Sequence, residues 1–539
     1  MFPGAGAGGV WPGDGVGAVG GVGAGVVVVG AGPVGLLVAC ELAAFGVGVA
    51  VVEARGSVSG RPRATTLHAR SVQSLVRRGY LGGFAGARTG AGRGNGGFHF
   101  AGMPGLTISV PVGEPVAVLK CEQQALERSL EERARAAGVA VLRGHRVSGV
   151  RETAEGVRVS AVGPGGRAVE WVAEYVVGAD GARGVVRELA GFASRSYPAT
   201  VSAMAGDVRL EETGALAAGW HRTPRGWVVV KDVAGGGVRL RTLNCEGAST
   251  ARGVPLSLEE FRGEVSRIVG REVGMGSPRW LSRFSDFSRL AGCYRKGRVL
   301  LAGDAAHVHF PIGGQGLSTG VLDALNLGWK LALTVRGWAG EGLLDTYDRE
   351  RRPAAQRVID HTRAQLELMR PDAELDPLRA LFGELLAGAP EGGVLASMVS
   401  GQDTVLPARG ADSSPWEGSF LANVPLVTGQ GRTDVIRLLA GGRPLLLLFA
   451  TGEVTGAREG ESASVDAGGY EAQARPWEGV LRVVRAEPVP GLPYGAVLVR
   501  PDGYVGWAAG GGGLAPALRA YFGGGGGAGV RDALPGAVS

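Results

Sequence analysis

At 539 residues, with 45% hydrophobic side chains, the chain is long enough for two or three domains with sizeable cores. Its net charge of +6 is modest and is not gathered into basic runs with interleaved aromatics, so a nucleic-acid partner is not expected. The four cysteines are far apart and form no Cys-x-x-Cys pair, which is typical of free thiols in a reducing cytoplasm. We therefore expect a cytoplasmic, multidomain protein.

The first 25 residues are mostly glycine, alanine and valine. They lack the basic stretch that opens a secretory signal peptide. Such a composition cannot bury enough apolar surface to fold, so we expect residues 1–25 to form a disordered leader, with a wrongly assigned start of the chain as the alternative.

The clearest motif is a strand, a glycine-rich turn, a helix and a second strand within residues 26–53. Four valines at 26–29 predict a buried parallel strand, and residues 36–45 carry apolar side chains at helical spacing. Residues 47–52 predict a second strand, which ends at Glu53. An acidic residue about 20 positions after the glycines completes the dinucleotide-binding fingerprint. The glycines of the turn are Gly30, Gly32 and Gly35.

Each part of this motif has a physical role. Gly30 makes the tight turn, Gly32 lets the backbone approach a pyrophosphate, and Gly35 lets helix and strand pack closely. The helix N-terminus offers free N–H groups to the phosphates. Glu53 can accept hydrogen bonds from a ribose diol. The motif therefore predicts a nucleotide site.

Two alternatives to a nucleotide site fail on context. The same glycine spacing occurs at residues 4–9, 15–20 and 92–97, but none of these matches follows a strand or opens an apolar helix. The run from Val26 is long enough to span a bilayer. However, Glu41 lies inside it and glycines interrupt it, so we expect no membrane span.

Two arginines after this unit are candidates for phosphate contacts. Residues 69–79 predict a helix that follows a loop. Arg63 and Arg70 would lie near the nucleotide, where a guanidinium suits a phosphate. In so arginine-rich a chain, a surface role for either one is an equally open alternative.

Acidic residues also follow two later predicted strands. Asp180 follows a strand that ends at Gly178, and Asp304 follows a strand over residues 299–302. The carboxyl ends of parallel strands are where such sheets place ligand contacts. A helix over residues 315–335 comes next, and the partial positive charge at its N-terminus would stabilise an anionic ligand.

A metal site is not expected beside this second strand. His307 and His309 are candidate ligands, but no third ligand lies at a usual spacing. Residues 197–290 alternate short strands with one helix and predict a separate sheet domain. From residue 443 onward, strands and a final helix predict a small α/β domain.

Three stretches together carry a family resemblance: GAGPVG with Glu53, GADG at 178–181, and LLAGDAAHVHFPIGGQGLSTG from Leu300. This set closely resembles the single-component FAD-dependent aromatic hydroxylases, the class of para-hydroxybenzoate and phenol hydroxylase. Within that class the chain looks most like the polyketide hydroxylases that oxidise angucycline and anthracycline intermediates. RATTLHAR at 63–70, MVSG at 398–401 and RPDGYVGWAA at 500–509 add to this likeness.

The resemblance implies an α/β fold with three parts. A Rossmann-like FAD-binding domain of the GR2 type would occupy residues 26–196 and, with a helical segment, residues 291–402. A mixed-sheet substrate domain would be inserted at residues 197–290. A thioredoxin-like domain without redox cysteines would occupy residues 403–539.

The resemblance also implies roles for single residues. Gln123 matches the family glutamine beside the flavin, and Asp180 matches the DG motif that serves both FAD and NAD(P)H. Asp304, after Gly303, matches the aspartate that hydrogen-bonds the ribityl chain. The ADP half of FAD would be held by Gly30, Gly32, Pro33, Gly35 and Glu53. The loop over the isoalloxazine would comprise Pro311, Gly314, Gly316, Leu317 and Ser318.

Two positions depart from the family pattern. Ser318 stands where the family usually has asparagine, and Gly184 stands where the DG segment usually has serine. Either departure could loosen flavin or nicotinamide binding.

The activity implied is a monooxygenation. NADPH or NADH would reduce FAD, O₂ would add at flavin C4a, and the resulting hydroperoxide would hydroxylate a phenolic ring of an aromatic polyketide. Protein side chains would only orient the substrate, so we expect no catalytic side chain. Baeyer–Villiger oxygen insertion and a non-catalytic flavin-binding protein stay open as alternatives, and a homodimer is an open possibility.

Overall fold

The computed structural model describes residues 24–60, 63–84, 87, 95–212, 214–233, 235–248, 254–388, 390–449 and 467–524. Nearly all of the predicted leader, residues 1–23, lies outside these ranges, as does the end of the chain after residue 524.

The first sheet has eight strands and is mainly parallel. Its central order is β18-β19-β10-β1-β2-β7, and β8 and β9 extend it as an antiparallel pair beside β10. The valines of β1 and β2 are buried on both faces. Helix α1 (Pro33–Ala44) packs against both strands, and β8 also contacts β2. The strands are β1 (Ala24–Val29), β2 (Val49–Glu53), β7 (Ala140–Arg143), β8 (Arg146–Thr153), β9 (Gly156–Val162), β10 (Ala168–Gly178), β18 (Arg295–Lys296) and β19 (Val299–Leu301).

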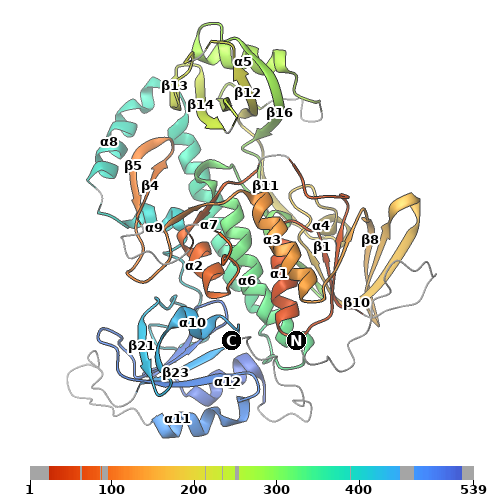
Figure 1. Cartoon of the computed structure of the whole chain (residues 1–539), viewed down its shortest axis with the longest axis vertical. Helices are drawn as coiled ribbons and strands as arrows, with labels where there is room; N and C mark the ends of the chain where they lie inside the picture. Colours follow the sequence, from red (N-terminus) through yellow and green to blue (C-terminus); the bar gives the residue numbers. More distant parts are fainter. Residues whose placement is uncertain are drawn as a thin grey trace.

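Helix α1 (Pro33–Ala44) occupies the middle of this part of the molecule (Figure 1). It packs against α3 (Gln123–Ala136) and α6 (Gly316–Val335), so almost all of its side chains are buried. An apolar helix of this kind is stable only when it is covered all round. Helices α2 (Ala69–Arg77) and α7 (Thr346–Met369) pack against α6 in turn.

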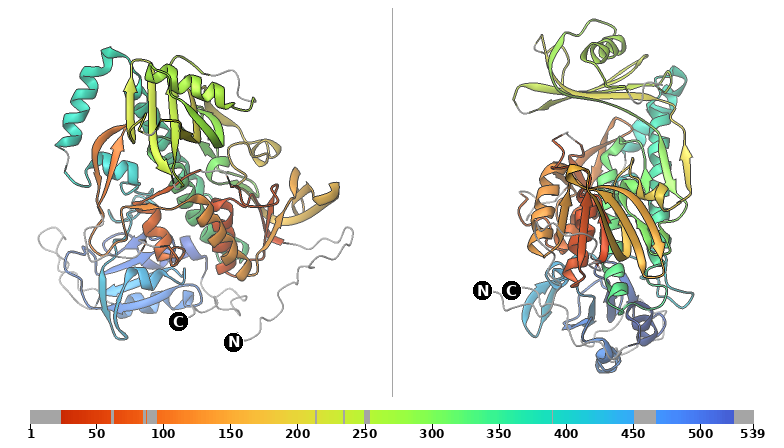
Figure 2. Two further views of the ribbon diagram at one scale, coloured as in Figure 1. Left: turned by 45° about the horizontal axis from the view of Figure 1, so that its top comes forward. Right: turned by 90° about the vertical axis from the view of Figure 1, so that its right-hand side faces the viewer.

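The second large sheet is antiparallel, in the order β13-β14-β15-β12-β16. Helix α5 (Leu258–Val269) covers one of its faces, and Figure 2 shows α5 on the side turned away from the first sheet. Ser257 caps the start of α5, and Gly270 ends it in the left-handed conformation. The strands are β12 (Ser202–Leu210), β13 (Gly219–Thr223), β14 (Gly226–Val233), β15 (Gly237–Asn244) and β16 (Met275–Ser285).

Three small sheets connect these two parts. The hairpin of β4 and β5 reaches toward the second sheet and packs on α8 and α9. These elements are β3 (Thr66–His68) with β6 (Val118–Lys120), β4 (Gly96–Phe100) with β5 (Met103–Ile108), β11 (Ser194–Tyr197) with β17 (Ser288–Ala291) and β20 (His307–Val308), α4 (Val186–Leu189), α8 (Asp376–Ala387) and α9 (Val394–Ser400).

The C-terminal part is a six-stranded mixed sheet in the order β22-β21-β24-β23-β25-β26. It lies at the bottom of the molecule in Figure 1 and carries its own apolar core around β23. Its elements are β21 (Pro425–Thr428), β22 (Gly431–Asp434), α10 (Val435–Leu439), β23 (Leu445–Phe449), α11 (Ala467–Ala474), β24 (Arg482–Ala486), β25 (Ala496–Val499), β26 (Val505–Ala508) and α12 (Leu514–Phe522).

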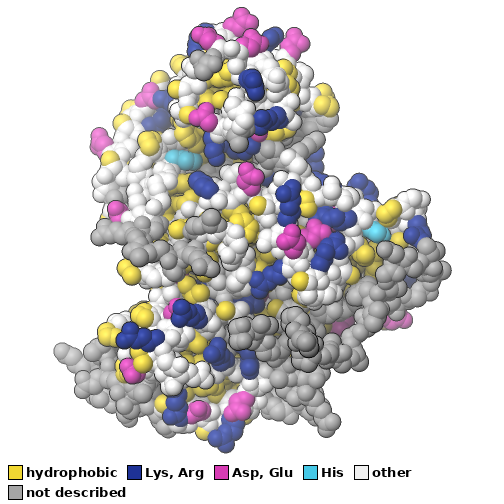
Figure 3. Space-filling model, viewed as in Figure 1, with side chains coloured by type: hydrophobic (Ala, Val, Ile, Leu, Met, Phe, Trp, Pro, Cys, Tyr) yellow, Lys and Arg dark blue, Asp and Glu magenta, His cyan; other side chains and the backbone are white. Residues whose placement is uncertain are grey.

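The structure confirms the mixed α/β class that the sequence predicts. Acidic and basic side chains are interspersed over the face shown in Figure 3. No helix within the described ranges combines the length and apolar character needed to cross a bilayer.

Candidate functional site

The predicted ligand-contacting residues meet at one edge of the first sheet. Strands β19, β10, β1 and β2 are consecutive neighbours and run parallel, so their carboxyl ends lie side by side. Gly30 follows β1, Glu53 ends β2, Asp180 follows β10, and Asp304 follows β19. The chain thus gathers at one edge four positions that are up to 274 residues apart in the sequence.

The three glycines of the turn differ sharply in their surroundings. A Cβ placed on Gly30, whose φ is +108°, would lie 2.4 Å from the carbonyl oxygen of Ala179. A Cβ on Gly35 would lie 2.0 Å from the carbonyl oxygen of Gly30. By contrast, a Cβ on Gly32 would have no described atom within 4 Å outside the adjacent residues. Two glycines therefore allow close protein packing, and the third leaves the backbone open to a ligand.

The open glycine also begins helix α1. Gly32 is its N-cap residue, Pro33 occupies the first turn, and no side chain caps the helix or adds negative charge there. The first N–H groups of a helix have no partner within the helix. They and the helix dipole favour an anion such as a pyrophosphate.

Glu53 reaches back to the same turn. Its Oε2 accepts a hydrogen bond of 2.9 Å from the backbone N–H of Ala31, and its Oε1 accepts one of 2.8 Å from the backbone N–H of Arg55. Each carboxylate oxygen can accept a second hydrogen bond. The carboxylate therefore holds the turn and keeps capacity for a ligand hydroxyl.

Asp180 is held with one oxygen satisfied and the other free of protein partners. Its Oδ2 accepts a 3.0 Å hydrogen bond from the backbone N–H of Val186, while its Oδ1 is buried without a partner among the described residues. Burial raises the pKa of this carboxyl. A buried oxygen without a partner is costly, and a bound ligand would remove that cost.

The same carboxylate accounts for Gly184. A Cβ at this position would lie 2.1 Å from Asp180 Oδ1, so a serine here would displace the carboxylate from its position. The departure at residue 184 is therefore matched to the Asp180 conformation of this chain.

Gly303 and Asp304 form a short turn at the end of β19. Gly303 has φ +60°, and a Cβ there would lie 3.0 Å from the side chain of Val34 on α1. Its N–H donates to Asp323 Oδ2 at 3.1 Å. Asp304 itself is exposed, so its carboxylate is available to a ligand.

A cluster of buried charged side chains contacts this turn through Asp323. Asp323, on α6, pairs with His307 at 2.6 Å and with Arg351 at 2.9 Å, and all three side chains are almost completely buried. Although burial raises the pKa of Asp323, His307 and Arg351 together hold that pKa below its usual value. One acidic residue in an otherwise apolar helix was the available sequence signal for this cluster.

The loop before α6 bends through glycines. Gly313 and Gly314 have φ values of +74° and +65°, which β-carbon-bearing residues rarely adopt. Pro311 at the start of this loop is exposed, whereas Leu317 in the first turn of α6 is buried. Gly316 is the first residue of α6, so the loop delivers the chain directly to a helix N-terminus.

Ser318 has its own hydrogen-bond partners inside the protein. Its Oγ accepts from the backbone N–H of His68 at 3.1 Å and lies 3.0 Å from Ser71 Oγ. His68 Nε2 in turn lies 2.7 Å from the carbonyl oxygen of Gly313. The small hydroxyl therefore ties α6 to the β3 strand and the start of α2.

Gln123 and Arg63 lie at the rim of this edge of the sheet. Gln123 begins α3, its N–H donates to Ala64 at 3.0 Å, and its side chain donates to Glu127 at 2.7 Å. Arg63 is exposed and forms no hydrogen bond or ion pair within the described ranges. It is free to reach a phosphate.

Arg70 lies in α2 and contacts the C-terminal part of the chain, and its contact with a phosphate stays a prediction. Its guanidinium donates to the carbonyl oxygens of Gly401 and Gln402 and stacks over the ring of Phe420, 3.7 Å from the ring centre. The side chain is 7% exposed. Two acceptors distant in sequence receive hydrogen bonds from this guanidinium, so Arg70 joins the C-terminal part to α2.

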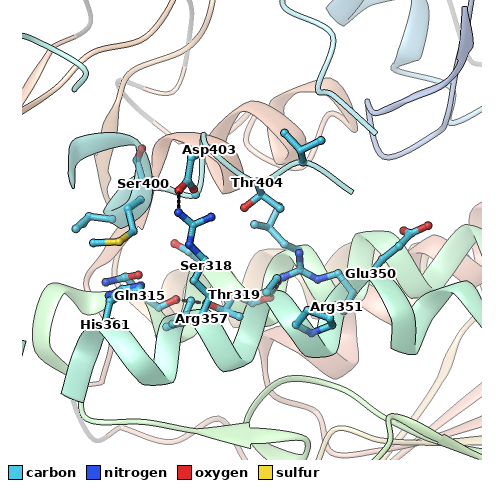
Figure 4. A pocket seen from close by; sticks show the side chains of 18 of the residues that line it. Gln315, Ser318, Thr319, Glu350, Arg351, Arg357, His361, Ser400, Asp403 and Thr404 are labelled. Carbon is cyan, nitrogen blue, oxygen red and sulfur yellow. Dashed lines mark hydrogen bonds and ion pairs between the residues drawn. The ribbon is translucent and has the colours of Figure 1, made fainter. Parts of the chain in front are cut away.

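A separate cavity of about 220 Å³ lies on another face of α6 (Figure 4). Gln315, Ser318 and His361 line it together with residues 398–401 and 403–405, and an ion pair between Arg357 and Asp403 crosses it. A Cβ on Gly320 would contact Val34 of α1, so a different face of α6 meets the glycine turn. The cavity is therefore separated from the nucleotide edge by the helix itself.

The sequence and structure match known families over most of the chain. A family described as an FAD-binding domain matches residues 24–362, and one described as the C-terminal domain of aromatic-ring hydroxylases matches residues 414–524. The chain belongs to the FAD-dependent aromatic-ring hydroxylases. Its cofactor is FAD, and its class is the flavoprotein monooxygenases of this family.

Several relatives are similar along nearly their whole length. Dialkyldecalin synthase of Streptomyces rugosporus is 38% identical over 92% of this chain and 98% of its own. The 12-dehydrotetracycline 5-monooxygenase/anhydrotetracycline 6-monooxygenase of Streptomyces rimosus is 36% identical over the same shares of the two chains. The structure of CabE, an aromatic hydroxylase from angucycline biosynthesis, superposes with a TM-score of 0.82 at 34% identity, covering 93% of this chain and all of its own.

Proposed function

We propose that the chain is an FAD-dependent, NAD(P)H-consuming monooxygenase that hydroxylates an aromatic polyketide of the angucycline or anthracycline type. The supporting geometric observation lies at one edge of the first sheet. There the open backbone at Gly32 begins a helix without a capping side chain, and after the neighbouring strand Asp180 Oδ1 is buried without a partner among the described residues. The tetracycline monooxygenase and the angucycline hydroxylase among the relatives support the substrate class.

The residues of this edge fit FAD. Gly30, Gly32, Pro33, Gly35 and Glu53 would hold the ADP half, with the pyrophosphate at the start of α1. Asp180 and Asp304 would accept hydrogen bonds from cofactor hydroxyls, and Gln123 and Arg63 would close the rim. The isoalloxazine would lie against the loop and first turn formed by Pro311, Gly314, Gly316, Leu317 and Ser318.

Bound FAD would supply the redox chemistry that couples NAD(P)H and O₂ to hydroxylation. The protein's share is to position the ring of the substrate and exclude water. Only one G-x-G-x-x-G stretch has the strand–helix context, so NAD(P)H would visit the flavin transiently and leave. No side chain is assigned to covalent or acid–base catalysis.

The test is oxygen transfer by the purified, FAD-loaded protein. We expect substrate-stimulated NADPH or NADH oxidation, and one ¹⁸O atom from ¹⁸O₂ in a hydroxylated product from a panel of phenolic polyketides. A ring-expanded lactone that carries ¹⁸O would instead indicate Baeyer–Villiger insertion. FAD binding without NAD(P)H consumption or product would indicate a flavin-binding protein without this activity.

A second candidate is a redox-neutral cyclisation. The observation that favours it is the 38% identity to dialkyldecalin synthase, which covers 98% of that protein. A cyclase would form an isomer of its substrate with no ¹⁸O and no consumption of NAD(P)H.

The proposal of a homodimer is tested separately by light scattering of the FAD-loaded protein.

A further inference from the structure

The face of the second sheet that points away from α5 carries three rows of side chains. Residues on a strand alternate between faces. Val228, Val230 and Leu240 pack under α5 with Phe261, so the residues between them point the other way. The strand register defines the rows as Trp227, Leu243, Ala203 and Phe284; then Val229, Arg241, Ala205 and Ser282; then Lys231, Arg239, Asp207 and Trp280.

The first row lies against the flavin loop. The ring of Phe284 stacks with that of Phe310, at 6.1 Å, and Phe310 directly precedes Pro311. At the other end of the row, the indole N–H of Trp227 donates to the carbonyl of Met369 at 2.6 Å. Side chains at both ends of the first row are therefore engaged in contacts within the protein.

Arg241 stands in the second row, about 7 Å along the strand from the first, since each residue advances a strand by about 3.4 Å. Its lateral neighbours are Val229 and Ala205, and Ser282 follows, so small side chains flank the guanidinium. It forms no hydrogen bond or ion pair in the part of the chain that the structure describes. Burial and then the neighbouring Arg239 lower the pKa of Arg241, and the attraction of Asp207 opposes them only in part.

The adjacent carboxylate is already occupied. Asp207 receives two hydrogen bonds from Arg239, Nε to Oδ1 at 2.7 Å and Nη2 to Oδ2 at 2.8 Å. This bidentate pair is the strongest arrangement of the two groups. Asp207 therefore forms its ion pair with Arg239, and it acts on Arg241 only through a longer-range electrostatic attraction.

Two lysines make the same region more positive. Lys120, at the end of β6, interacts electrostatically with Lys231 of the third row, and burial and then Lys231 lower the pKa of Lys120. Lys120 also contributes to the lowered pKa of His99, which burial brings to about 4, so that histidine is neutral at pH 7. His99 stacks on Phe98, and its ring centre lies 4.6 Å from that of Trp220. The region thus combines flat, uncharged rings with excess positive charge.

We propose that Arg241 is the specificity-determining residue of the substrate site and binds an acidic oxygen, a carboxylate or an enolate, on a flat polycyclic substrate. The inference deepens the proposed function by naming the charge of the substrate. It rests on the assignment of the flavin loop next to the first row. Arg241 acts by binding and orienting this group and takes no part in oxygen transfer.

Equilibrium binding to the FAD-loaded protein tests this assignment without turnover. The probes are 1-hydroxy-2-naphthoate, which is anionic at pH 7.5, and its neutral amide, each titrated against the flavin absorbance. We expect the wild type to prefer the anion by roughly 10- to 100-fold, as a charged hydrogen-bonded pair provides. Arg241→Gln should bring that ratio near one with little change for the amide, and Arg241→Lys should restore part of it.

Arg209→Gln is the matched control, because it removes the same charge from an exposed position on β12 of the same sheet. It should keep the preference of the wild type. A wild type that does not prefer the anion, or an Arg241→Gln variant that still does, would overturn the assignment. Because no NAD(P)H is present, an Arg241-dependent preference would hold even if oxygen transfer is never observed, so the two proposals fail separately.

Discussion

Two polar regions of the molecule differ in whether their polar groups have hydrogen-bond partners within the protein. At the carboxyl edge of the first sheet, Asp180 keeps an unpaired oxygen and Gly32 keeps an open backbone. At the junction between α6, α7 and the C-terminal sheet, five buried polar side chains satisfy one another. That cluster, which we call the junction cluster, consists of Asn326, Lys330, Glu350, Arg500 and Asp502.

The junction cluster is a closed network. Lys330 Nζ donates to Glu350 at 2.7 Å, and Arg500 donates to both oxygens of Glu350 at 2.9 and 2.7 Å. Burial lowers the pKa of Lys330 to about 7. Burial alone would raise the pKa of Glu350, but Arg500 and Lys330 hold it far below its usual range. The comparison teaches that satisfied buried charge joins the domains, whereas unsatisfied polar groups mark where a ligand binds.

The largest effect of a single substitution should follow from breaking the junction cluster. Glu350→Gln leaves Lys330 and Arg500 buried with too little negative charge, which should cost roughly 3–5 kcal/mol of unfolding free energy. Urea unfolding measures the loss. Glu367→Gln, on the exposed side of the same helix, should change stability by less than about 0.5 kcal/mol. Equal losses of unfolding free energy in the two variants would mean that the junction cluster contributes no more to stability than an exposed ion pair does.

Low pH should reduce the unfolding free energy, because buried histidines must accept protons. Burial lowers the pKa of His68, His309 and His361 to about 4, from an ordinary value of 6.5. The folded state therefore binds fewer protons than the unfolded state between these values. Stability should be full above pH 6.5 and fall as the pH drops toward 4, by about 1.4 kcal/mol per pH unit for each histidine.

Urea midpoints at pH 7.5, 6 and 5 check this dependence. His361→Gln should reduce the loss of unfolding free energy with falling pH by the contribution of one histidine, about 1.4 kcal/mol per pH unit. A wild-type stability that is constant from pH 7 to 5 would show that these side chains accept protons without unfolding.

The aspartate after β19 gives the next effect. Asp304→Asn removes the charge of an exposed acceptor, so FAD affinity should fall roughly 10-fold or more, as loss of charge-assisted hydrogen bonds does. Fluorescence titration of the apoprotein with FAD measures it, and the unfolding free energy without FAD should not change. An unaltered dissociation constant would remove Asp304 from the cofactor site. Asp345→Asn, an exposed partner of Arg295, is the matched control.

The smallest changes sharpen the comparison within the glycine turn. Gly35→Ala pushes a methyl group against the carbonyl of Gly30 and should cost roughly 1–3 kcal/mol of stability even without FAD. The methyl group of Gly32→Ala meets no described atom outside the adjacent residues, so it should leave the apoprotein unchanged and weaken only FAD binding. Parallel melting curves with and without FAD separate the two. Loss of apoprotein stability in Gly32→Ala would contradict the open backbone.

Much of the fold and the outline of the site could be predicted from local sequence. The valines of β1, the apolar spacing of α1 and the acidic residue ending β2 act through neighbours a few positions away, and the structure confirms these elements. The parallel order of the strands then places Asp180 and Asp304 at the same edge. The partners of Arg70 could not be predicted in this way, because residues 401, 402 and 420 lie more than 300 positions away.

The sequence by itself determined where the chain turns, because a glycine turn and a buried strand depend on backbone conformation and side-chain size at successive positions. Only the tertiary structure decided which charges are paired. Glu350 meets Arg500 across 150 residues, and Asp207 meets Arg239 across 32, while Arg241 two residues further on meets no described partner. Whether a charge is satisfied depends on the groups that folding brings within about 3 Å of it, and no local pattern specifies those groups.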